Sequence, residues 1–368
     1  MNRICLLIPS LELGGMERVM SELINEFAKS NSMEVHLVLY GITRGIFYSV
    51  PSMVRVHKPP FHFNDRWRTF YTVRTMWYLR RELQAIAPDS ILSFGEIWNN
   101  FVLLSTLGMH LPIFVSDRSS PAKKLPLIQE GLRALLYKRA KGVIVQTQAA
   151  RAIYARKFVK ADVCVIGNPI RAIHPPESVH RENIVLSVGR LIESKHHESL
   201  IRLFLKLSIP GWRLVIIGDD AQKQKVKAKL ETLIQHMGGG QKVTLAGTQR
   251  DVDGFYLKSK IFASMSSSEG FPNVLGEAMA AGLPVIAFDC VAGPSELITD
   301  GENGFLVPLF DYDSYEKKLR SLMTDEQLRV SFGNEAKERV KRFSTNTVAQ
   351  QYHDFILDNE TTPSKFDC

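Results

Sequence analysis

Two glutamates eight positions apart, Glu269 and Glu277, are the residues of this chain that most clearly suggest chemistry. Glu269 follows three serines in a polar loop, and Glu277 lies one turn inside an alanine-rich segment that reads as a helix. Pro272 and Asn273 are typical of the start of that helix and Gly282 of its end. A carboxylate at this junction can accept hydrogen bonds from sugar hydroxyls, while the free N–H groups of the helix start bind an anion. Hydroxyls beside phosphates are what a nucleotide sugar presents.

The alternative interpretation of this segment is an ordinary capped helix with an exposed Glu277. The residues that follow Glu277 are apolar, however, and a charge in apolar surroundings needs a partner or a hydroxyl ligand.

A pair of cations, Arg190 and Lys195, forms the second candidate site. They span a loop that leads from a predicted strand into a predicted helix. Arginine offers a planar fork and lysine a point charge, so the two can converge on one diphosphate. Cations near a helix start are unfavourable against its dipole, which indicates that an anion sits nearby. The alternative is a pair of solvated cations.

Two consecutive glycines, Gly14 and Gly15, form the third candidate site, because they follow the first predicted strand and open the first predicted helix. They let the backbone approach a ligand, and the helix start favours negative charge. The segment is not a GxGxxG sequence, so it gives little support to dinucleotide binding. A plain strand-to-helix turn is the alternative.

Three further signals are interpreted as structural rather than chemical. DxD sequences begin at Asp251 and at Asp311, but the first reads as a helix cap and the second as a loop before the last helices, not as metal ligands. His196 and His197 are adjacent, so in a helix they point in different directions, and we interpret them as surface and packing residues. We therefore expect no metal site.

Short apolar runs alternate with helical patterns along the whole chain, which is typical of parallel α/β units. Strands are predicted at 4–8, 35–40, 90–94, 112–116, 142–146, 163–166, 184–188, 214–217, 243–245, 261–263 and 284–288. Helices are predicted at 16–30, 69–87, 195–206, 222–237, from Asn273 to Gly282, in one or two pieces over 314–342, and at 344–357. Two doubly wound sheets in succession place a ligand outside the carboxyl ends of their strands, in a cleft where the sheets face one another.

The predicted domain boundaries follow the breaks in this pattern. Three prolines after Gly167 indicate a linker. The predicted parts are a first domain 1–168, a linker 169–182, a second domain 183–342, a C-terminal helix 343–360 that crosses back to the first domain, and a frayed tail 361–368.

The composition of the 368 residues, with 45% hydrophobic and 23% charged residues, is that of an ordinary globular protein. Its four widely separated cysteines predict buried packing residues at Cys5, Cys164 and Cys290 and a tail thiol at Cys368, with no disulfide framework or zinc site. The first apolar run is too short for a signal peptide, and no stretch approaches the roughly 20 residues that span a bilayer. A cytoplasmic location is therefore expected.

The net charge of +8 is uneven, with +10 over residues 1–170 and −2 over residues 171–368. A basic half suggests an anionic partner. No recognition helix, zinc finger or RNP-like sequence supports nucleic acid, so an anionic membrane surface or a lipid phosphate fits better. The cations and aromatics that suggest it are Arg66, Trp67, Arg68, Arg74, Trp77, Tyr78, Arg80, Arg81, Lys123, Lys124, Lys138, Arg139 and Lys141. The alternative is a solvated helix face with the tryptophans packed inward.

Taken in order, Gly14-Gly15, Arg190-x4-Lys195, Glu269-x7-Glu277 and the stretch 300–307 resemble the retaining GT-B glycosyltransferases of family 4, over about residues 3–357. The resemblance implies two Rossmann-like doubly wound domains facing a central cleft. It also implies a nucleotide sugar held mainly by the second domain, an acceptor held mainly by the first, a returning last helix and no metal or other cofactor.

The resemblance also implies roles for individual residues. Arg190 and Lys195 would bind the donor diphosphate and take up charge as the leaving group departs, with the Gly15 N–H on the same phosphates. Glu277 would hold the ribose hydroxyls and Glu269 would face the transferred sugar, as a nucleophile only if it lay against the anomeric carbon. The backbone of Gly270, Phe271, Pro272, Asn273 and Val274 would contact sugar hydroxyls and phosphate, and Gly247 and Thr248 would lie against the base.

Departures from the common family pattern narrow the resemblance to one group of family members. Many members have glycine where this chain has Pro272, and this version is similar to bacterial enzymes that build lipid-linked oligosaccharides, O-antigen or capsule from UDP-sugars. Asp117 and Arg118 stand where relatives carry acceptor-side residues. They are candidates for acceptor or sugar contact, with a strand-end salt bridge as the alternative.

These patterns predict an enzyme that moves a hexose or N-acetylhexosamine from a nucleotide sugar, UDP-linked by preference, to an undecaprenyl-diphosphate-linked glycan at the inner face of the cytoplasmic membrane. The alternatives are a GDP-mannose-dependent mannosyltransferase, a catalytically silent nucleotide-sugar-binding subunit, and a GT-B epimerase or phosphorylase. The intact set of cations and carboxylates argues against a silent subunit.

Overall fold

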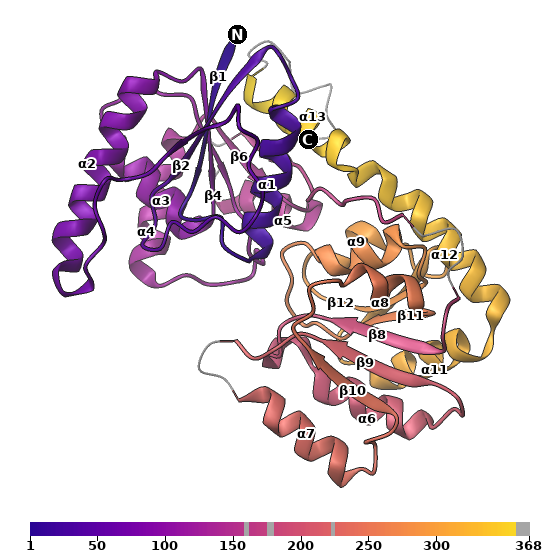
Figure 1. The fold of residues 1–368 in the computed structure, drawn as a ribbon. Coiled ribbons are helices and arrows are strands. Elements are labelled where there is room, and N and C mark those ends of the chain that lie inside the picture. The colour runs from indigo at the N-terminus through magenta and orange to yellow at the C-terminus, as the bar shows by residue number, and fades with distance from the viewer. Residues whose placement is uncertain (158–161, 175–179, 222–224, 358–368) are drawn as a thin grey trace. The chain divides into compact units, whose positions relative to one another are not determined.

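The structure, a computed structural model, describes residues 1–157, 162–174, 180–221 and 225–357 (Figure 1). The chain divides into two compact units, one formed by Met1–Pro169 with Thr345–Cys368 and the other by Ile170–Ser344. The expected tail 361–368 with Cys368, part of the expected linker and the first residues of the predicted helix 222–237 lie outside the described residues.

The described residues of the first unit form a seven-stranded parallel sheet in the order β3-β2-β1-β4-β5-β6-β7. The strands are β1 (Asn2–Ile8), β2 (Met33–Leu39), β3 (Arg55–His57), β4 (Ser90–Phe94), β5 (Ile113–Ser116), β6 (Gly142–Val145) and β7 (Val163–Val165). The helices are α1 (Gly15–Phe27), α2 (Arg68–Ile86), α3 (Glu96–Ser105), α4 (Leu127–Leu136), α5 (Gln148–Lys157) and α13 (Thr345–Leu357), with 3-10 turns at Asp65–Trp67 and Tyr137–Arg139.

Helices cover both faces of this sheet, which explains why its strands read as continuous apolar runs. In β1, every residue from Ile4 to Ile8 is buried. Helices α2, α3 and α4 pack in sequence on one face, and α1 and α13 pack against each other on the opposite face (Figure 1). The C-terminal helix α13 thus completes the unit that contains the N-terminus.

The described residues of the second unit form a six-stranded parallel sheet in the order β10-β9-β8-β11-β12-β13. The strands are β8 (Ile184–Val188), β9 (Arg213–Ile217), β10 (Val243–Gly247), β11 (Ile261–Ser264), β12 (Val285–Asp289) and β13 (Gly304–Pro308). The helices are α6 (His197–Leu207), α7 (Val226–His236), α8 (Asp253–Lys258), α9 (Asn273–Ala280), α10 (Pro294–Leu297), α11 (Tyr312–Thr324) and α12 (Glu326–Val340), with 3-10 turns at Glu193–Lys195 and Lys341–Phe343.

The core of the second unit has two layers, one on each face of its sheet. Successive residues of one strand enter different layers, as Val185 and Leu186 of β8 do, because side chains alternate across a strand. Helices α6, α7 and α11 contribute to the first layer, α8, α9 and α10 to the second, and α12 to both. This arrangement confirms the predicted class of two doubly wound α/β units.

The predicted strands 90–94 and 184–188 are found with the same bounds, and the other predicted strands shift by a few residues at their ends. Two strands were not predicted. Strand β3 has three residues, two of them exposed, so it carries no apolar run. Strand β13 lies inside the segment that we interpreted only as a sequence signature. Helix α6 begins at His197 rather than at Lys195, because Lys195 ends a 3-10 turn and His196 is left-handed.

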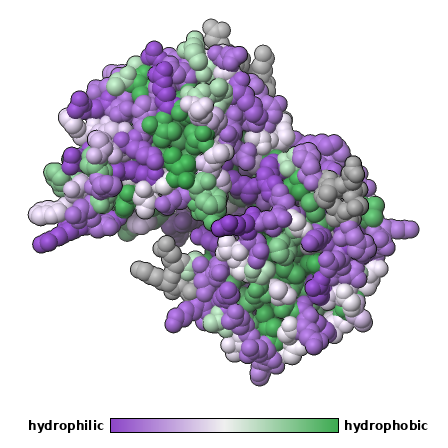
Figure 2. Space-filling view, viewed as in Figure 1, coloured by the Kyte–Doolittle hydropathy of each residue, from purple (hydrophilic) through white to green (hydrophobic). Residues whose placement is uncertain are grey.

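Hydrophilic side chains cover most of the face shown in Figure 2, with apolar patches between them. The described cysteines Cys5, Cys164 and Cys290 are buried and free, as predicted. In the described part of the chain, every helix is too short or too polar to cross a membrane.

Candidate active site

Glycines stand at the carboxyl ends of three neighbouring strands of the second unit. Because glycine has no side chain, they leave space at this edge of the sheet. Gly189 follows β8, Gly218 follows β9, and Gly247 is the last residue of β10. A Cβ atom on Gly218, whose φ is +141°, would lie 1.9 Å from the carbonyl oxygen of Gly189. Only glycine allows this approach of two backbones. The loops after β8 and β9 can therefore pack tightly and leave room above the sheet.

The two groups of residues predicted from the sequence meet at this edge. The Lys195 Nζ lies 2.5 Å from the Glu269 Oε1, and the two side chains are only 17% and 13% exposed. The ion pair therefore joins the turn after β8 to the loop after β11. The stem of Lys195 passes over Gly189, where a Cβ atom would meet its Cε at 3.4 Å.

Arg190 lies on the same turn and is exposed. Within the described ranges, no carboxylate forms an ion pair with Arg190. The charge of Arg190 is therefore open to a ligand, whereas Asp219, which follows Gly218 at the same edge, lies 3.8 Å from the Lys227 Nζ. An anionic ligand is the complementary partner.

Helix α9 begins at this same place, directly after the Glu269 loop. Its N-cap residue is Pro272, so no side chain caps its first N–H groups. An uncapped helix start favours an anion. The loop before it is held by Gly293, whose φ is +106°; a Cβ atom there would lie 2.7 Å from the Pro272 Cδ and 3.4 Å from the Glu269 Cβ. The backbone from Gly270 to Val274 thus has a fixed course beside Glu269.

Glu277 is buried, with 6% of its surface exposed, in agreement with the sequence argument that it needs a partner. The hydroxyl of Tyr256, a fully buried residue of α8, donates to the Glu277 Oε2 at 3.1 Å. Burial of a carboxylate without a hydroxyl or N–H partner would be costly. Tyr256 was not predicted as this partner, because nothing in its spacing along the chain links it to Glu277.

The remaining predicted donor residues lie at the end of one strand and at the start of one helix. Gly247 ends β10 and the exposed Thr248 follows it, at the edge of the same sheet. Gly15 is the first residue of α1 and belongs to the first unit. Its neighbour Gly14 accepts a hydrogen bond from the Tyr48 hydroxyl at 3.1 Å. The contact of Gly15 with phosphates stays a prediction.

Asp117, at the carboxyl end of β5 in the first unit, is 4% exposed and surrounded by donors. Its Oδ1 accepts from the Tyr137 hydroxyl at 2.5 Å and from the Asn99 amide at 2.9 Å. Its Oδ2 accepts from the Tyr154 hydroxyl and lies 3.4 Å from the Arg133 Nη1. Burial and the nearby Glu96 raise the pKa of Asp117 to about 6. These contacts favour the strand-end salt bridge over an acceptor contact for Asp117.

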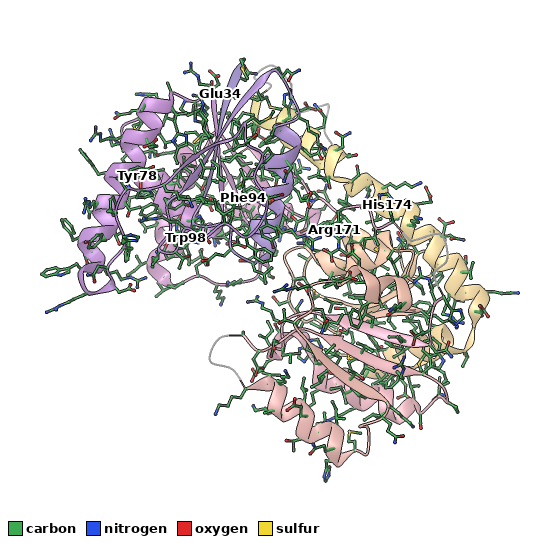
Figure 3. All side chains as sticks on the ribbon, viewed as in Figure 1. Glu34, Tyr78, Phe94, Trp98, Arg171 and His174 are labelled. Atoms are coloured by element: carbon green, nitrogen blue, oxygen red, sulfur yellow. The ribbon has the colours of Figure 1, made fainter. Side chains whose placement is uncertain are left out.

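Arg118 is more accessible and differs from Asp117 in its surroundings. Its guanidinium lies 4.6 Å from the ring centre of Phe94, which Figure 3 labels. It donates to the Tyr352 hydroxyl at 2.9 Å and to the Asn168 Oδ1 at 2.5 Å. The carboxylate of Glu96 accepts from the Arg118 backbone N–H at 3.0 Å and fixes the loop. Arg118 stays a candidate for acceptor contact.

The DxD sequences have structural partners. Asp251 accepts from the Gly254 N–H at 3.0 Å in the first turn of α8, whose N-cap residue is Val252. Asp311, expected in a loop, is the N-cap of α11 and accepts from the Ser314 N–H at 3.0 Å. Asp253 pairs with Arg171.

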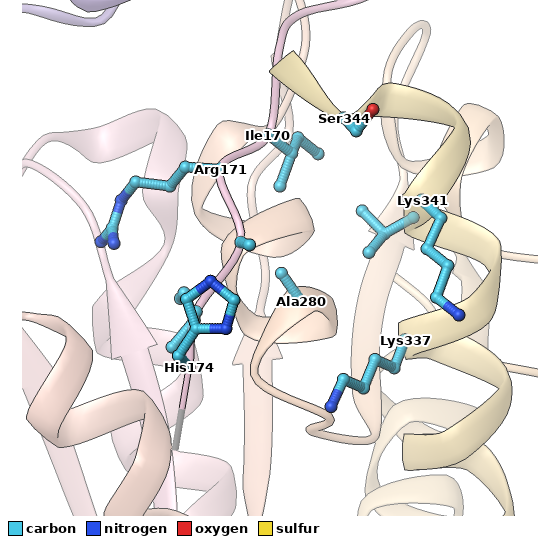
Figure 4. A pocket seen from close by; sticks show the side chains of 10 residues that line it. Ile170, Arg171, His174, Ala280, Lys337, Lys341 and Ser344 are labelled. Carbon is cyan, nitrogen blue, oxygen red and sulfur yellow. The ribbon is translucent and has the colours of Figure 1, made fainter. Parts of the chain in front are cut away.

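A separate cavity of about 180 Å³ lies in the second unit at the opposite end of α9 (Figure 4). Ala280, Val340 and Ile173 line it together with the side chains of His174 and Lys337. Because α9 runs between this cavity and Asn273, the cavity is not part of the cluster around Glu269.

The comparisons with known proteins agree with this geometry. Residues 13–172 match the family described as Glycosyltransferase Family 4, and residues 170–339 match Glycosyl transferases group 1. The chain therefore belongs to the GT-B glycosyltransferases of family 4, built from two Rossmann-like domains, and it is a glycosyltransferase.

Individual relatives are similar over nearly the whole chain. The GalNAc-alpha-(1->4)-GalNAc-alpha-(1->3)-diNAcBac-PP-undecaprenol alpha-1,4-N-acetyl-D-galactosaminyltransferase of Campylobacter jejuni is 27% identical over 97% of this chain and 99% of its own length. The amylovoran biosynthesis glycosyltransferase AmsD of Erwinia amylovora is 27% identical over 93% of this chain and 96% of its own length. The crystal structure of Anabaena Alr3699/HepE in complex with UDP and glucose has a TM-score of 0.79 at 20% identity, covering 96% and 98% of the two chains.

His197 provides a test of how tightly the loop after β8 is packed. Its ring is 4% exposed, and neither ring nitrogen has a hydrogen-bond partner in the described part of the chain. Burial, and then the charge of Lys195, lower the pKa of His197 from 6.5 to about 4. The unfolded chain binds this proton at higher pH, so the free energy of unfolding falls as the pH drops from 6.5 towards 4, by about 3 kcal/mol for this residue.

We expect the variant His197→Leu to lose less stability over this pH range than the unchanged protein, as measured by urea unfolding. Equal losses in both proteins would contradict this account, and His236→Leu, at an exposed histidine, is the control.

Asp117→Ala is expected to destabilise the first unit by about 3–5 kcal/mol, because it removes the buried acceptor of two tyrosine hydroxyls and one of the two carboxylates paired with Arg133, which keeps Glu130. Urea unfolding followed by tryptophan fluorescence measures the loss. Asp65→Ala, which removes an exposed ion pair with Arg68, should change stability by less than about 0.5 kcal/mol. A similar small effect for both variants would show that the Asp117 cluster is not part of the stable core.

Proposed function

We propose that this glycosyltransferase is a metal-independent retaining enzyme that moves a hexose or N-acetylhexosamine from a UDP-sugar to an undecaprenyl-diphosphate-linked glycan, in the synthesis of a bacterial surface polysaccharide. The observation that carries the proposal is the cluster of Arg190, the Lys195–Glu269 ion pair and the uncapped start of α9. It offers cations and N–H groups to a diphosphate, and a carboxylate to sugar hydroxyls.

The donor and acceptor classes have support from relatives. Two Campylobacter jejuni proteins that resemble this chain carry undecaprenol or undecaprenol diphosphate and N-acetylgalactosamine in their names. The solved structure of HepE contains UDP and glucose, and that of a TarM variant contains UDP. These names motivate UDP-N-acetylgalactosamine as the first donor to test.

The proposed chemistry is electrostatic. Departure of a nucleoside diphosphate places negative charge on its β-phosphate and oxocarbenium character on the sugar. Lys195, held by Glu269, and the first N–H groups of α9 are in place before the reaction, so they stabilise this charge with little reorganisation, and the exposed Arg190 on the same turn adds a second cation. We assign no protein nucleophile, and the leaving phosphate serves as the base for the acceptor hydroxyl, with retention of configuration.

In the bound donor, we propose that Glu277 holds the ribose hydroxyls and Glu269 the transferred sugar. The ion pair with Lys195 orients Glu269 before the sugar arrives. Gly247 and Thr248 lie against the base, and Gly15 of the first unit donates its N–H to the phosphates. Arg118 contacts the acceptor.

The exposed side chains of α2 and of the 3-10 turn before it support contact with a membrane surface. Trp67, Phe70, Val73 and Trp77 are each about 60% exposed, which contradicts the alternative in which the tryptophans pack inward. Arginines stack on aromatic rings there, with Arg81 over Trp77 at 4.8 Å. Exposed aromatics between arginines suit the boundary between lipid headgroups and acyl chains.

Helix α4 adds apolar surface to the same side of the first sheet. Its first turn exposes Leu127 by 90% and Ile128 by 78%. Helix α3 contacts both α2 and α4, so the three helices form one layer. We propose that this layer faces the inner leaflet, where a lipid-linked acceptor is presented, and that the enzyme is peripheral at the cytoplasmic face.

Replacement of Arg190, Lys195 or Glu277 by alanine is expected to lower kcat at least about 100-fold with the fold intact, since each removes a group that stabilises charge or orients the donor. The measurement is sugar transfer from UDP-N-acetylgalactosamine in EDTA, with the anomer of the product read by NMR. Lys206→Ala, which removes an exposed ion pair with Glu316, is the matched control and should keep the unchanged rate.

A screen of nucleotide sugars tests the donor. Turnover with GDP-mannose and none with UDP-sugars would overturn the UDP assignment in favour of a mannosyltransferase. Binding of UDP-sugars without any transfer would favour the silent subunit.

Membrane contact predicts stronger co-sedimentation with anionic vesicles than with neutral vesicles, and a loss of binding in high salt. The double variant Arg74→Glu, Arg81→Glu should bind anionic vesicles at least about 30-fold more weakly, because each arginine near the surface contributes roughly 1 kcal/mol. Arg320→Glu, on an exposed position of the second unit, is the control. Equal partitioning of the unchanged protein into both kinds of vesicle would rule out an electrostatic membrane contact.

A further inference from the structure

His196 has a backbone conformation that is unfavourable for any residue other than glycine. Its φ is +49°, in the left-handed region, between the 3-10 turn that ends at Lys195 and the start of α6. Residues other than glycine adopt this region at a cost in free energy, because their Cβ atom approaches the backbone. Glycine would adopt the same turn without strain. We therefore expect a contact of the His196 side chain to offset the free-energy cost of this conformation.

The ring of His196 contacts the loop that carries Glu269. Its Nε2 lies 2.9 Å from the hydroxyl oxygen of Ser267, two positions before Glu269. The opposite face of the turn is tied to the same loop, since the Ser267 N–H donates to the Ser194 carbonyl at 2.8 Å. The ring also meets Phe310 edge to face at 5.3 Å, and Phe310 is itself left-handed with φ of +68°.

The protons of this contact can be assigned from the partners. Both contacts of the Ser267 hydroxyl are satisfied together when it donates to the Ser194 carbonyl at 3.3 Å and accepts from the His196 Nε2 at 2.9 Å. This arrangement places a proton on the His196 Nε2. Burial lowers the pKa of His196, which keeps the ring neutral with one N–H. The ring thus donates to the loop without adding a third positive charge beside Arg190 and Lys195.

We propose that His196 is a positioning residue that holds the Ser267–Glu269 loop against the turn of Lys195, so that the ammonium and the carboxylate stay paired when the donor binds. The proposal rests on the proposed function, in which Lys195 binds the diphosphate and Glu269 faces the sugar. His196 itself would contact neither the diphosphate nor the sugar. A histidine at this position costs backbone strain, but its side chain connects two loops that follow different strands.

Substitution of His196 by glycine separates positioning from stability. His196→Gly relieves the left-handed strain and removes the tether, so its thermal midpoint should equal or exceed that of the unchanged protein. Its kcat should fall about 10- to 100-fold, since small displacements of catalytic groups are costly. His196→Gln keeps an N–H donor of similar reach and should stay within about 3-fold of the unchanged kcat. Ser267→Ala, which removes the other partner, should resemble the glycine variant in kcat.

An unchanged kcat in His196→Gly would overturn the proposal, and so would a loss of kcat in the glycine and glutamine variants alike. Absence of transfer by the unchanged protein would instead contradict the proposed function. Crystal structures of the variants give a readout independent of turnover. The Ser267–Glu269 loop should move away from Ser194 and Lys195 in His196→Gly and stay in place in His196→Gln. A loop that does not move in the glycine variant overturns the tether.

Discussion

The ion pair between Lys195 and Glu269 is the interaction on which the organisation of the second unit's ligand edge depends. Both side chains are mostly buried, so the pair is weakly screened and each charge would be costly without the other. To form it, β8 and β11 must end side by side, the glycines at Gly189 and Gly218 must let the loops approach, and Gly293 must let the next loop close on Pro272. Exposed Arg190, which has no ion-pair partner among the described residues, and the uncapped start of α9 then add donors for an anion. These features support the proposed binding of a ligand that carries both phosphates and hydroxyls.

Much of the fold was predictable because parallel strands covered on both faces are continuous apolar runs. Ile4–Ile8 and Ile184–Val188 are such runs, and proline and glycine punctuate them. Strand β3 was missed because an edge strand of three residues, with Arg55 and Val56 exposed, carries no pattern of its own. The start of α6 was placed two residues early. The left-handed turn at His196 ends the 3-10 segment, and a histidine there gives no sign of that conformation.

The candidate site was predictable where spacing along the chain carries the chemistry. Arg190 and Lys195 share one turn, and Glu269 precedes the helix that contains Glu277, so both groups could be read from the sequence. Partners from distant elements could not. Tyr256 reaches Glu277 from α8, and Ser267 meets His196 from another strand, with no periodicity linking them. Asp117 is the reverse case, because its sequence position suggested a ligand contact whereas three buried donors and Arg133 occupy its oxygens.

We propose that the second unit binds the diphosphate of a nucleotide sugar through Arg190, Lys195 and the N-terminus of α9, with the nucleoside as a secondary contact. Calorimetric titration of the protein with UDP and with uridine, in buffer containing EDTA, measures the contribution of the diphosphate. UDP should bind at least about 100-fold more tightly than uridine, since the charge-assisted hydrogen bonds to phosphate exist only for UDP. Equal affinities for UDP and uridine would contradict it.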